Sequence, residues 1–262
     1  MDPMQWKEAT TMINENTTMK LHMLKLHAMA DEFERQKQAS GATRLSFDER
    51  FSMIVDCEFS RKENNRLTRL IRNAGFTDPC ACIEGVEWGA GRKLDNALIQ
   101  KLASCEFITS RLNAHILGAT GVGKTYLACA LGVAACRNSI STKYTRLPDI
   151  LIELALAKEN GTYTEAVKAF GKPRLLIIDD WLMFRANENE AHMMYDLIEK
   201  RDRVGSIIVC SQFDSAGWHD LIDNPIAADS ICDRIAHNSY KIVISGESMR
   251  KRKNAADAVA GA

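Results

Sequence analysis

The chain lacks the composition that marks several classes of protein. Its 34 Lys and Arg residues are balanced by 34 Asp and Glu residues, so only local basic clusters could draw it to nucleic acid. No apolar run is long enough to cross a membrane, and the polar residues 1–15 do not resemble a signal peptide. The eight cysteines are scattered, and Cys80-Ala81-Cys82 is spaced too closely for a zinc site. We therefore expect a cytoplasmic protein with reduced thiols and no membrane partner.

One segment fits the pattern G-x-x-x-x-G-K-[ST], the phosphate-binding loop of P-loop NTPases. It consists of Gly118, Ala119, Thr120, Gly121, Val122, Gly123, Lys124 and Thr125. The glycines allow the backbone to curl so that N–H groups face phosphate oxygens, and the helix that follows adds its positive dipole end. Lys124 would reach the β- and γ-phosphates of ATP, and the Thr125 hydroxyl would bind Mg²⁺. We include the next residue, Tyr126, in the predicted cofactor site.

The flanking sequence supports this assignment. Residues 113–117 are typical of a short strand, and residues 126–137 have apolar side chains at helical spacing with no proline. Strand, loop and helix is the arrangement that a phosphate-binding loop requires. A glycine-rich turn that binds nothing is the alternative, and this context disfavours it.

A second element indicates the same class of protein. Residues 175–180 form an apolar run of the buried parallel-strand type that ends in two carboxylates. In the Walker B strand of a P-loop NTPase, one carboxylate joins the Mg²⁺ shell and another orients the attacking water. We assign the first role to Asp179 and the second to Asp180. The alternative, a buried strand capped by solvated acids, accounts poorly for the phosphate loop upstream.

Other candidate site residues have a functional and a purely structural interpretation. Cys210, Ser211 or Gln212 could sense the γ-phosphate at the end of a strand over 206–210, or simply turn into solvent. Arg234 suits a γ-phosphate supplied across a subunit interface, or a surface ion pair with Asp229 or Asp233.

A basic helix face is the strongest signal for DNA binding. It comprises Arg61, Lys62, Arg66, Arg69 and Arg72. At 100° per residue these positions cover about 140° of a helix, opposite an apolar side. Such a face can bind phosphates or be merely solvated. A second cluster, residues 250–253, is equally ambiguous.

The chain divides into segments of different pattern. Residues 1–75 are predicted to be a helical N-terminal domain that binds DNA or a partner, with an apolar stripe from Met19 towards Phe33 and a second helix that starts at the capping box Ser46–Glu49. Residues 76–92, with Pro and Gly, are predicted to be a linker. Residues 93–253 alternate helices and strands, including one helix over 94–107 and a strand over 140–145, as in a parallel α/β domain. Residues 254–262 form a small-residue tail that we expect to be disordered.

Together these motifs resemble the IstB family, the ATP-binding helper proteins of insertion sequences. The resemblance rests on GVGKTYLA (121–128), YTRLPDIL (144–151), LIIDDW (176–181), DRIAHN (233–238) and GESMRK (246–251). Residues 46–50 and 61–72 are also similar, so the likeness covers nearly the whole chain.

The resemblance implies an AAA+ ATPase core, related to bacterial helicase loaders, with sheet order 5-1-4-3-2 and a small helical N-terminal domain. It implies ATP and Mg²⁺ as cofactors, assembly of a homo-oligomer on duplex DNA, and the transposase of the same element as a partner. The resemblance also implies that Arg234 is an arginine finger that acts on a neighbour's ATP. The other expected catalytic residues are Lys124, Asp179 and Asp180.

Three positions depart from the family pattern. Ala119 stands where Pro is usual, which the loop should tolerate. Leu182 replaces a Gly, so we expect a differently shaped loop after Asp180. Cys210 replaces Thr or Asn and is a weak hydrogen-bonding group, which argues against phosphate sensing there. Asp180 fits this family, but its side chain is shorter than the Glu of most AAA+ proteins, which predicts slow hydrolysis.

Two other functions fit parts of the pattern. A helicase loader would share the core, and an exposed apolar patch on the N-terminal domain would favour it over the DNA-bound protein that a basic helix indicates. A P-loop kinase of a small molecule would need an Arg-rich lid segment near the C-terminus, which the sequence lacks.

Overall fold

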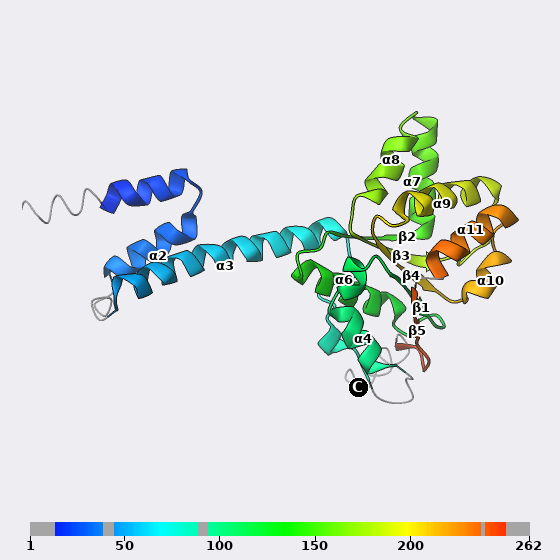
Figure 1. The fold of residues 1–262 in the computed structure, drawn as a ribbon, viewed down its shortest axis with the longest axis horizontal. Coiled ribbons are helices and arrows are strands. Elements are labelled where there is room, and N and C mark those ends of the chain that lie inside the picture. The colour runs from blue at the N-terminus through cyan, green and yellow to red at the C-terminus, as the bar shows by residue number, and fades with distance from the viewer. Residues whose placement is uncertain (1–13, 39–44, 89–93, 237–238, 250–262) are drawn as a thin grey trace, which may run out of the picture. The chain divides into compact units, whose positions relative to one another are not determined.

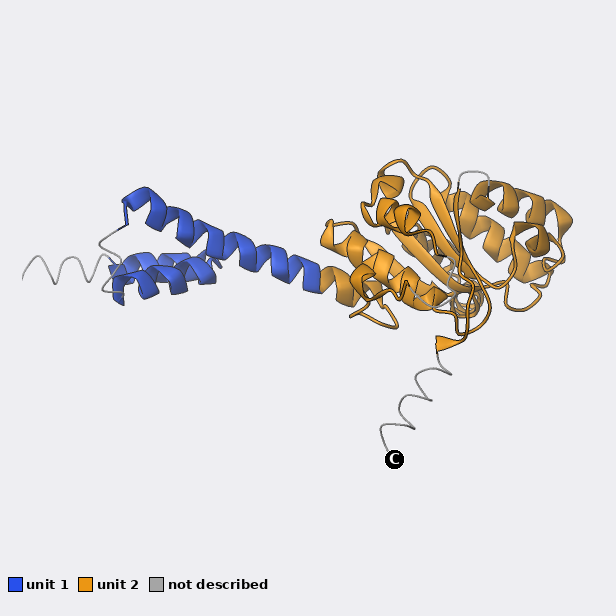
Figure 2. Ribbon diagram, turned by 90° about the horizontal axis from the view of Figure 1, so that it is seen from below, with its two compact units in different colours: residues 1–68 blue, residues 69–262 orange. Residues whose placement is uncertain are grey.

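The computed structural model describes residues 14–38, 45–88, 94–236 and 239–249 (Figure 1). The chain forms two compact units, residues 1–68 and residues 69–262 (Figure 2). The boundary between them falls inside one helix, α3 (Phe47–Ala74). The predicted division into residues 1–75, 76–92 and 93–253 stays a prediction, and the predicted tail lies outside the described residues.

The first unit is helical in its described part. It contains a helical segment over 14–23, then α2 (His27–Gln38) and most of α3. The predicted capping box is present: the Ser46 N–H donates to the Glu49 carboxylate at 2.8 Å, and the Glu49 N–H donates to the Ser46 hydroxyl at 3.2 Å. At the other end of α3, Gly75 has a φ of 72°, the conformation that terminates many helices.

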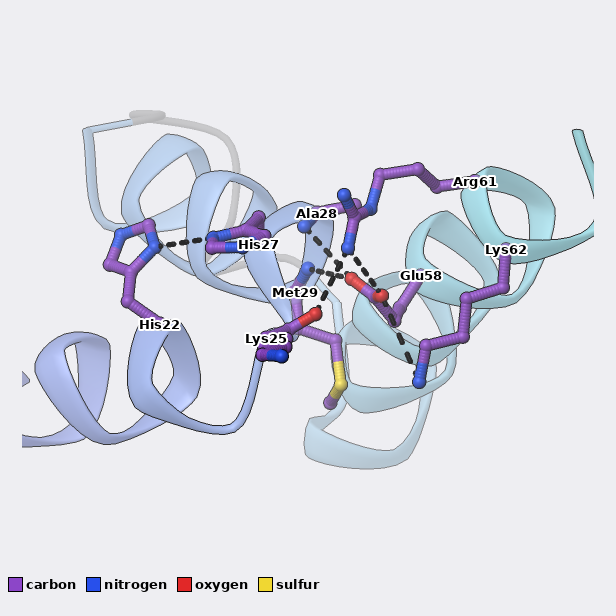
Figure 3. Close-up of polar contacts among 8 residues, drawn as sticks. All are labelled: His22, Lys25, His27, Ala28, Met29, Glu58, Arg61 and Lys62. Carbon is purple, nitrogen blue, oxygen red and sulfur yellow. Dashed lines mark hydrogen bonds and ion pairs between the residues drawn. The ribbon is translucent and has the colours of Figure 1, made fainter. Parts of the chain in front are cut away.

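A buried carboxylate on α3 caps the start of α2 (Figure 3). Glu58 accepts hydrogen bonds from the backbone N–H groups of Ala28 at 2.9 Å and Met29 at 3.3 Å. Arg61 also donates to Glu58, at 2.8 Å, and to the carbonyl of Lys25, at 3.0 Å. Because the first N–H groups of a helix have no partner within the helix, this carboxylate satisfies donors that α2 cannot satisfy itself.

The apolar residues of this unit are mostly not in a core. Met19 and Met23, from the stripe that the sequence marks, are 56% and 76% exposed. The stripe does not continue as one helix, because the chain turns at Lys25, where φ is 60°. On α3 a second set of apolar side chains is exposed at a spacing of four residues, the α3 apolar stripe. It comprises Phe47, Phe51, Val55 and Phe59.

The second unit is a five-stranded parallel sheet covered by helices on both faces. The strand order is β2-β3-β4-β1-β5. Read from the other edge, this is the predicted order 5-1-4-3-2, which is confirmed. The strands are β1 (Asn113–Leu117), β2 (Thr142–Arg146), β3 (Leu175–Trp181), β4 (Ser206–Ser211) and β5 (Ser239–Val243). The helices are η2 (Ile83–Gly85), α4 (Asn96–Ala103), α5 (Glu106–Thr109), α6 (Lys124–Arg137), α7 (Leu147–Glu159), α8 (Tyr163–Gly171), α9 (Glu188–Arg201), α10 (Ser215–His219) and α11 (Pro225–Ala236).

The central strand β3 explains the apolar run in the sequence. Residues 175–178 are fully buried, since helices lie on both sides of the sheet. The side chains of Leu176 and Ile178 face a core built with α7, α8, α9 and α11. Helices α4 and α6 cover the other face (Figure 1).

Two details differ from the sequence-based expectation. The single helix predicted over 94–107 is wrong: it is split into α4 and α5 at Cys105, whose φ of 64° no α-helix can contain. The expected strand over 140–145 begins later, at Thr142, and α8 was not predicted as an element of its own.

All eight cysteines are free. Cys57 and Cys80 are exposed, whereas Cys105, Cys129, Cys136 and Cys210 are buried. Burial raises the pKa of Cys105 to about 11. Within the described ranges, no helix has the combination of length and apolar character that a bilayer crossing demands.

The contacts of Glu58 generate a prediction about the first unit. Replacing Glu58 with Ala should raise the hydrogen-exchange rates of the first amides of α2, because removal of a helix cap costs about 0.5–2 kcal/mol. Hydrogen exchange followed by mass spectrometry on the full chain would measure this. Glu63→Ala is the matched control, since Glu63 is exposed and lies 3.8 Å from Arg66. Equal exchange in the two variants would contradict the capping role.

Candidate nucleotide-binding site

The predicted phosphate loop joins the end of β1 to the start of α6. Gly121 and Gly123 have φ angles of 83° and 101°, a region in which a residue with a side chain is strained. Gly123 is the N-cap of α6, so the positive end of the helix dipole faces the loop. The loop therefore has the backbone of an anion site, as the sequence predicts.

The structure brings together the two residues that we predicted to bind Mg²⁺. The Thr125 hydroxyl donates to Asp179 Oδ2 at 2.7 Å, although the two residues are 54 positions apart. A hydroxyl and a carboxylate are hard oxygen ligands, which suit Mg²⁺. No cluster of three or more His, Cys, Asp or Glu residues exists in the described part of the chain. Thr125 and Asp179, with phosphate oxygens of a nucleotide, are thus the residues that fit the ion.

Lys124 lies over the same loop. Its Nζ donates to the carbonyls of Gly118 at 2.8 Å and Ala119 at 3.0 Å. The ammonium group therefore lies against the backbone of the phosphate loop, and its binding to phosphates stays a prediction.

The two carboxylates of β3 have different surroundings. Asp179 is 4% exposed and its Oδ2 also accepts a hydrogen bond from the Tyr144 hydroxyl at 2.8 Å. Asp180 is partly exposed and forms an ion pair with Arg146 Nε at 2.7 Å. The buried carboxylate is thus fixed by neutral donors, and the accessible one by a single cation.

These side chains line one cavity of about 360 Å³. Five lining residues were not predicted to be site residues: Thr77, Tyr144, Arg146, Trp181 and Met183. Tyr144 and Arg146 belong to the YTRLPDIL segment and stand two positions apart at the end of a strand, a spacing that could have placed them on one face of the sheet. Nothing in the sequence around Thr77 indicates its position.

The three candidates for phosphate sensing differ in whether their side chains can reach a phosphate in the cavity. Cys210 is buried and its thiol lies 3.9 Å from the Lys124 carbonyl. The Ser211 hydroxyl donates to the Trp181 carbonyl at 3.0 Å and accepts a hydrogen bond from the Trp218 indole. Gln212 is exposed and lines the cavity. Gln212 is therefore the candidate whose side chain can turn towards a phosphate.

The loop after Asp180 keeps a glycine-like backbone at Leu182. Its φ is 49°, the left-handed region that glycine enters without strain. The Leu182 side chain is fully buried in the core, which offsets the cost of about 1–2 kcal/mol for a side chain in this conformation. The backbone at Leu182 therefore has a conformation that glycine favours.

Two further segments border the loop. The backbone N–H of Met249 donates to the Gly121 carbonyl at 2.8 Å, and a Cβ on Gly121 would collide with Ser248. Ser248 and Met249, from the described part of the GESMRK segment, therefore lie against the phosphate loop. The Tyr126 hydroxyl bonds to the backbone of Cys82 rather than facing the cavity, so Tyr126 anchors residues 82–85 to α6.

Arg234 lies far from the phosphate loop of its own chain. Its backbone carbonyl accepts a hydrogen bond from Asn113 at the start of β1, whereas the loop follows the end of β1, roughly 13 Å away along the strand. The guanidinium lies 5.6 Å from the Tyr195 ring centre and donates to the Ser230 carbonyl. Asp229, one of the two predicted surface partners of Arg234, pairs instead with His219.

The basic residues of α3 differ in the hydrogen bonds and ion pairs that they form. Arg61 is bound to Glu58 and to the Lys25 carbonyl (Figure 3), so it supports the fold of the first unit. Lys62 lies 3.9 Å from Glu58 and Arg66 lies 3.8 Å from Glu63, at the outer limit of an ion pair. Arg69 and Arg72 are exposed. The second basic cluster, residues 250–253, lies outside the described residues.

Solved structures share the fold of the second unit. The chain is similar to the crystal structure of DnaI, with a TM-score of 0.52 and 20% identity over 69% of this chain and 92% of that one. It is also similar to AMPPCP-bound DnaA from Aquifex aeolicus, with a TM-score of 0.53 and 19% identity over 69% of this chain and 56% of that one. The ATP-binding unit thus has the P-loop AAA+ fold.

Proteins related in sequence share a higher identity with this chain than these solved structures do. An insertion sequence ATP-binding protein of Sinorhizobium fredii is 36% identical over 92% of this chain and 98% of its own length. The IS1162 ATP-binding protein of Pseudomonas fluorescens is 38% identical over 78% of this chain and 89% of its own. The model of the IstB-like ATP binding protein family matches residues 19–257. The chain therefore belongs to the IstB-like ATP-binding protein family, as its motifs predicted.

Proposed function

We propose that this protein is an ATPase that assembles on duplex DNA and recruits or stimulates the transposase of its own insertion sequence. The observation that carries the proposal is the hydrogen bond between Thr125 and Asp179 beneath the phosphate loop, in a chain whose relatives are insertion sequence ATP-binding proteins. The same cavity holds a second carboxylate, which hydrolysis requires in addition to binding.

The residues of the cavity divide the chemistry of hydrolysis among them. Lys124 and the loop amides would bind the phosphates, and Thr125 and Asp179 would hold Mg²⁺. The bound ion would neutralise charge on the β- and γ-phosphates. Asp180 is the carboxylate that can orient a water molecule, but its Oδ2 is paired with Arg146. That ion pair has to open before Asp180 can act on water, so hydrolysis should be slow in the protein alone.

The ion pair generates a prediction. Arg146→Ala should raise ATP turnover in the absence of DNA by up to about fivefold, because a partly exposed ion pair is worth about 0.2–1 kcal/mol. Steady-state phosphate release would measure it. Arg185→Ala is the matched control, since Arg185 forms an ion pair of similar length with Asp223, 2.9 Å, elsewhere on the surface. A fall in turnover would instead assign Arg146 to phosphate binding.

Helix α3 supports DNA binding. Its second half carries Lys62, Arg66, Arg69 and Arg72, which are exposed. Lys62 lies 3.9 Å from Glu58 and Arg66 lies 3.8 Å from Glu63, both at the outer limit of an ion pair. Exposed cations of this kind exchange their partners for phosphate oxygens at little cost. Lys62 and Arg66 lie four residues apart, so one turn of the helix presents two of them together.

The same helix also supports binding to a protein. The α3 apolar stripe exposes Phe47 by 77% and Phe59 by 67%, which is typical of a protein interaction surface. An exposed apolar patch is what a helicase loader would show, and DnaI shares the fold of the ATP-binding unit. The insertion sequence relatives match almost the whole chain, the N-terminal region included, and they favour a transposase as the partner.

The basic half of α3 can be tested directly. Arg66→Ala with Arg69→Ala should weaken binding to duplex DNA and reduce the slope of log K against log salt by about 1.8, since each neutralised phosphate contributes about 0.9. Fluorescence anisotropy with ATP at several salt concentrations would measure both quantities. Arg137→Ala with Lys158→Ala, exposed cations of the ATP-binding unit, is the control. An unchanged slope would show that the α3 face is only solvated.

The position of Arg234 predicts catalysis between subunits. Because its side chain packs on Tyr195, away from its own phosphate loop, Arg234 would act on the ATP of a neighbouring copy. Arg234→Ala should bind ATP normally and lose most of its turnover, and so should Asp180→Asn. Mixing the two variants should restore part of the turnover in a phosphate-release assay, because some neighbours then combine an intact Asp180 with an intact Arg234. Mixtures that stay inactive would place Arg234 outside the reaction.

A further inference from the structure

One hydrogen-bond chain in the cavity lies outside the set of residues that P-loop motifs provide. It begins at Thr77, three residues after the end of α3, and reaches the predicted Mg²⁺ ligand Asp179 through Tyr144. Thr77 and Tyr144 both line the cavity.

Tyr144 holds one oxygen of Asp179 in place. Its hydroxyl donates to Oδ2 at 2.8 Å, the oxygen that also accepts from Thr125 at 2.7 Å. The other oxygen, Oδ1, accepts from the backbone N–H of Asp180 at 2.9 Å. Three donors from α6, β2 and β3 therefore fix the orientation of the carboxylate.

The residues that follow α3 determine where Tyr144 lies. The Phe76 ring is buried and its centre lies 6.5 Å from that of Tyr144, at a tilt of 56°. The Thr77 side chain hydrogen bonds to the Tyr144 hydroxyl, and both residues line the cavity. Phe76 also packs so closely on α6 that a Cβ at Gly132 would collide with its ring.

We propose that Tyr144 is a positioning residue for the Mg²⁺ ligand Asp179, and that Phe76 and Thr77 couple the C-terminal end of α3 to it. Any displacement of the end of α3 shifts Phe76 and Thr77, and these contact the Tyr144 ring and hydroxyl directly. A change in Tyr144 alters the orientation of the Asp179 carboxylate, on which the affinity for metal-bound nucleotide depends. The coupling part rests on the proposed binding of DNA by α3.

The alternative is that Tyr144 is only a core residue whose buried hydroxyl needs a partner. A core role and a positioning role differ in what they change. Loss of a core contact lowers the stability of the fold and weakens nucleotide binding with and without Mg²⁺ alike. Loss of a positioning contact weakens only the part of the affinity that depends on Mg²⁺.

Tyr144→Phe separates the two roles, because it removes the hydroxyl and keeps the ring that packs on Phe76. Binding of a fluorescent ATP analogue to the full chain would be measured with Mg²⁺ and with EDTA. We expect the affinity with Mg²⁺ to fall by about tenfold, the usual lower limit for loss of a group that orients a metal ligand. The affinity in EDTA and the melting temperature should be close to those of the unmodified chain.

Tyr163→Phe is the matched control. Tyr163 also donates to a carboxylate, that of Asp196 at 2.7 Å, but does not line the cavity. Tyr163→Phe should leave the ratio of the two affinities unchanged. An equal loss of affinity with Mg²⁺ and with EDTA in Tyr144→Phe, or no loss at all, would overturn the positioning role.

Thr77→Val tests the coupling to α3. If DNA bound at α3 acts through Thr77, duplex DNA raises or lowers the affinity of the unmodified chain for the Mg²⁺-bound analogue, and Thr77→Val reduces that change. DNA that binds without changing the affinity would overturn the coupling and leave the proposed DNA binding intact. Failure of DNA to bind at all would overturn the proposed DNA binding and the coupling together, whereas the result for Tyr144→Phe would be unaffected.

Discussion

The carboxylate of Asp179 connects the helix after the phosphate loop with the neighbouring strand of the sheet. It receives the hydroxyl of Thr125 from the helix after the phosphate loop and the hydroxyl of Tyr144 from the neighbouring strand. The Tyr144 contact depends on the parallel register of β2 and β3, in which Tyr144 pairs with Ile177 and Arg146 with Asp179. A slip of one residue between β2 and β3 would turn these side chains to the other face of the sheet. The same register also brings Arg146 to Asp180, so one strand edge supplies a partner to each carboxylate.

Helix α3 combines two kinds of surface that are usually found on different elements. Its first half exposes the apolar stripe, and its second half exposes cations. Between them, Glu58 is buried and caps α2, which fixes one side of α3 within the first unit. DNA phosphates would contact the second half of α3, and an apolar protein surface would contact the first half. Binding of DNA therefore does not exclude binding of a protein. One helix can therefore serve both the DNA binding and the protein binding that we propose.

Much of the site could be predicted because local spacing determines it. The phosphate loop, the two carboxylates after a buried run and the capping box at Ser46 each depend on residues within a few positions of one another. What could not be predicted depends on pairing across the fold. The contact of Arg146 with Asp180 follows from strand register, and the contact of Thr77 with Tyr144 follows from where the chain runs after α3. The break at Cys105 was missed because the flanking residues keep a helical pattern while one φ angle is positive.

The distribution of the free thiols has a practical consequence for labelling. Burial raises the pKa of Cys105, Cys129, Cys136, Cys210 and Cys232, and a thiol reacts with alkylating reagents as its thiolate. Cys57 and Cys80 are the exposed thiols, and they belong to different compact units. A maleimide dye added briefly to the unmodified chain would therefore react first at these two positions. The natural sequence thus carries one fluorescent attachment point on each unit, one within α3 and one beyond its C-terminal end.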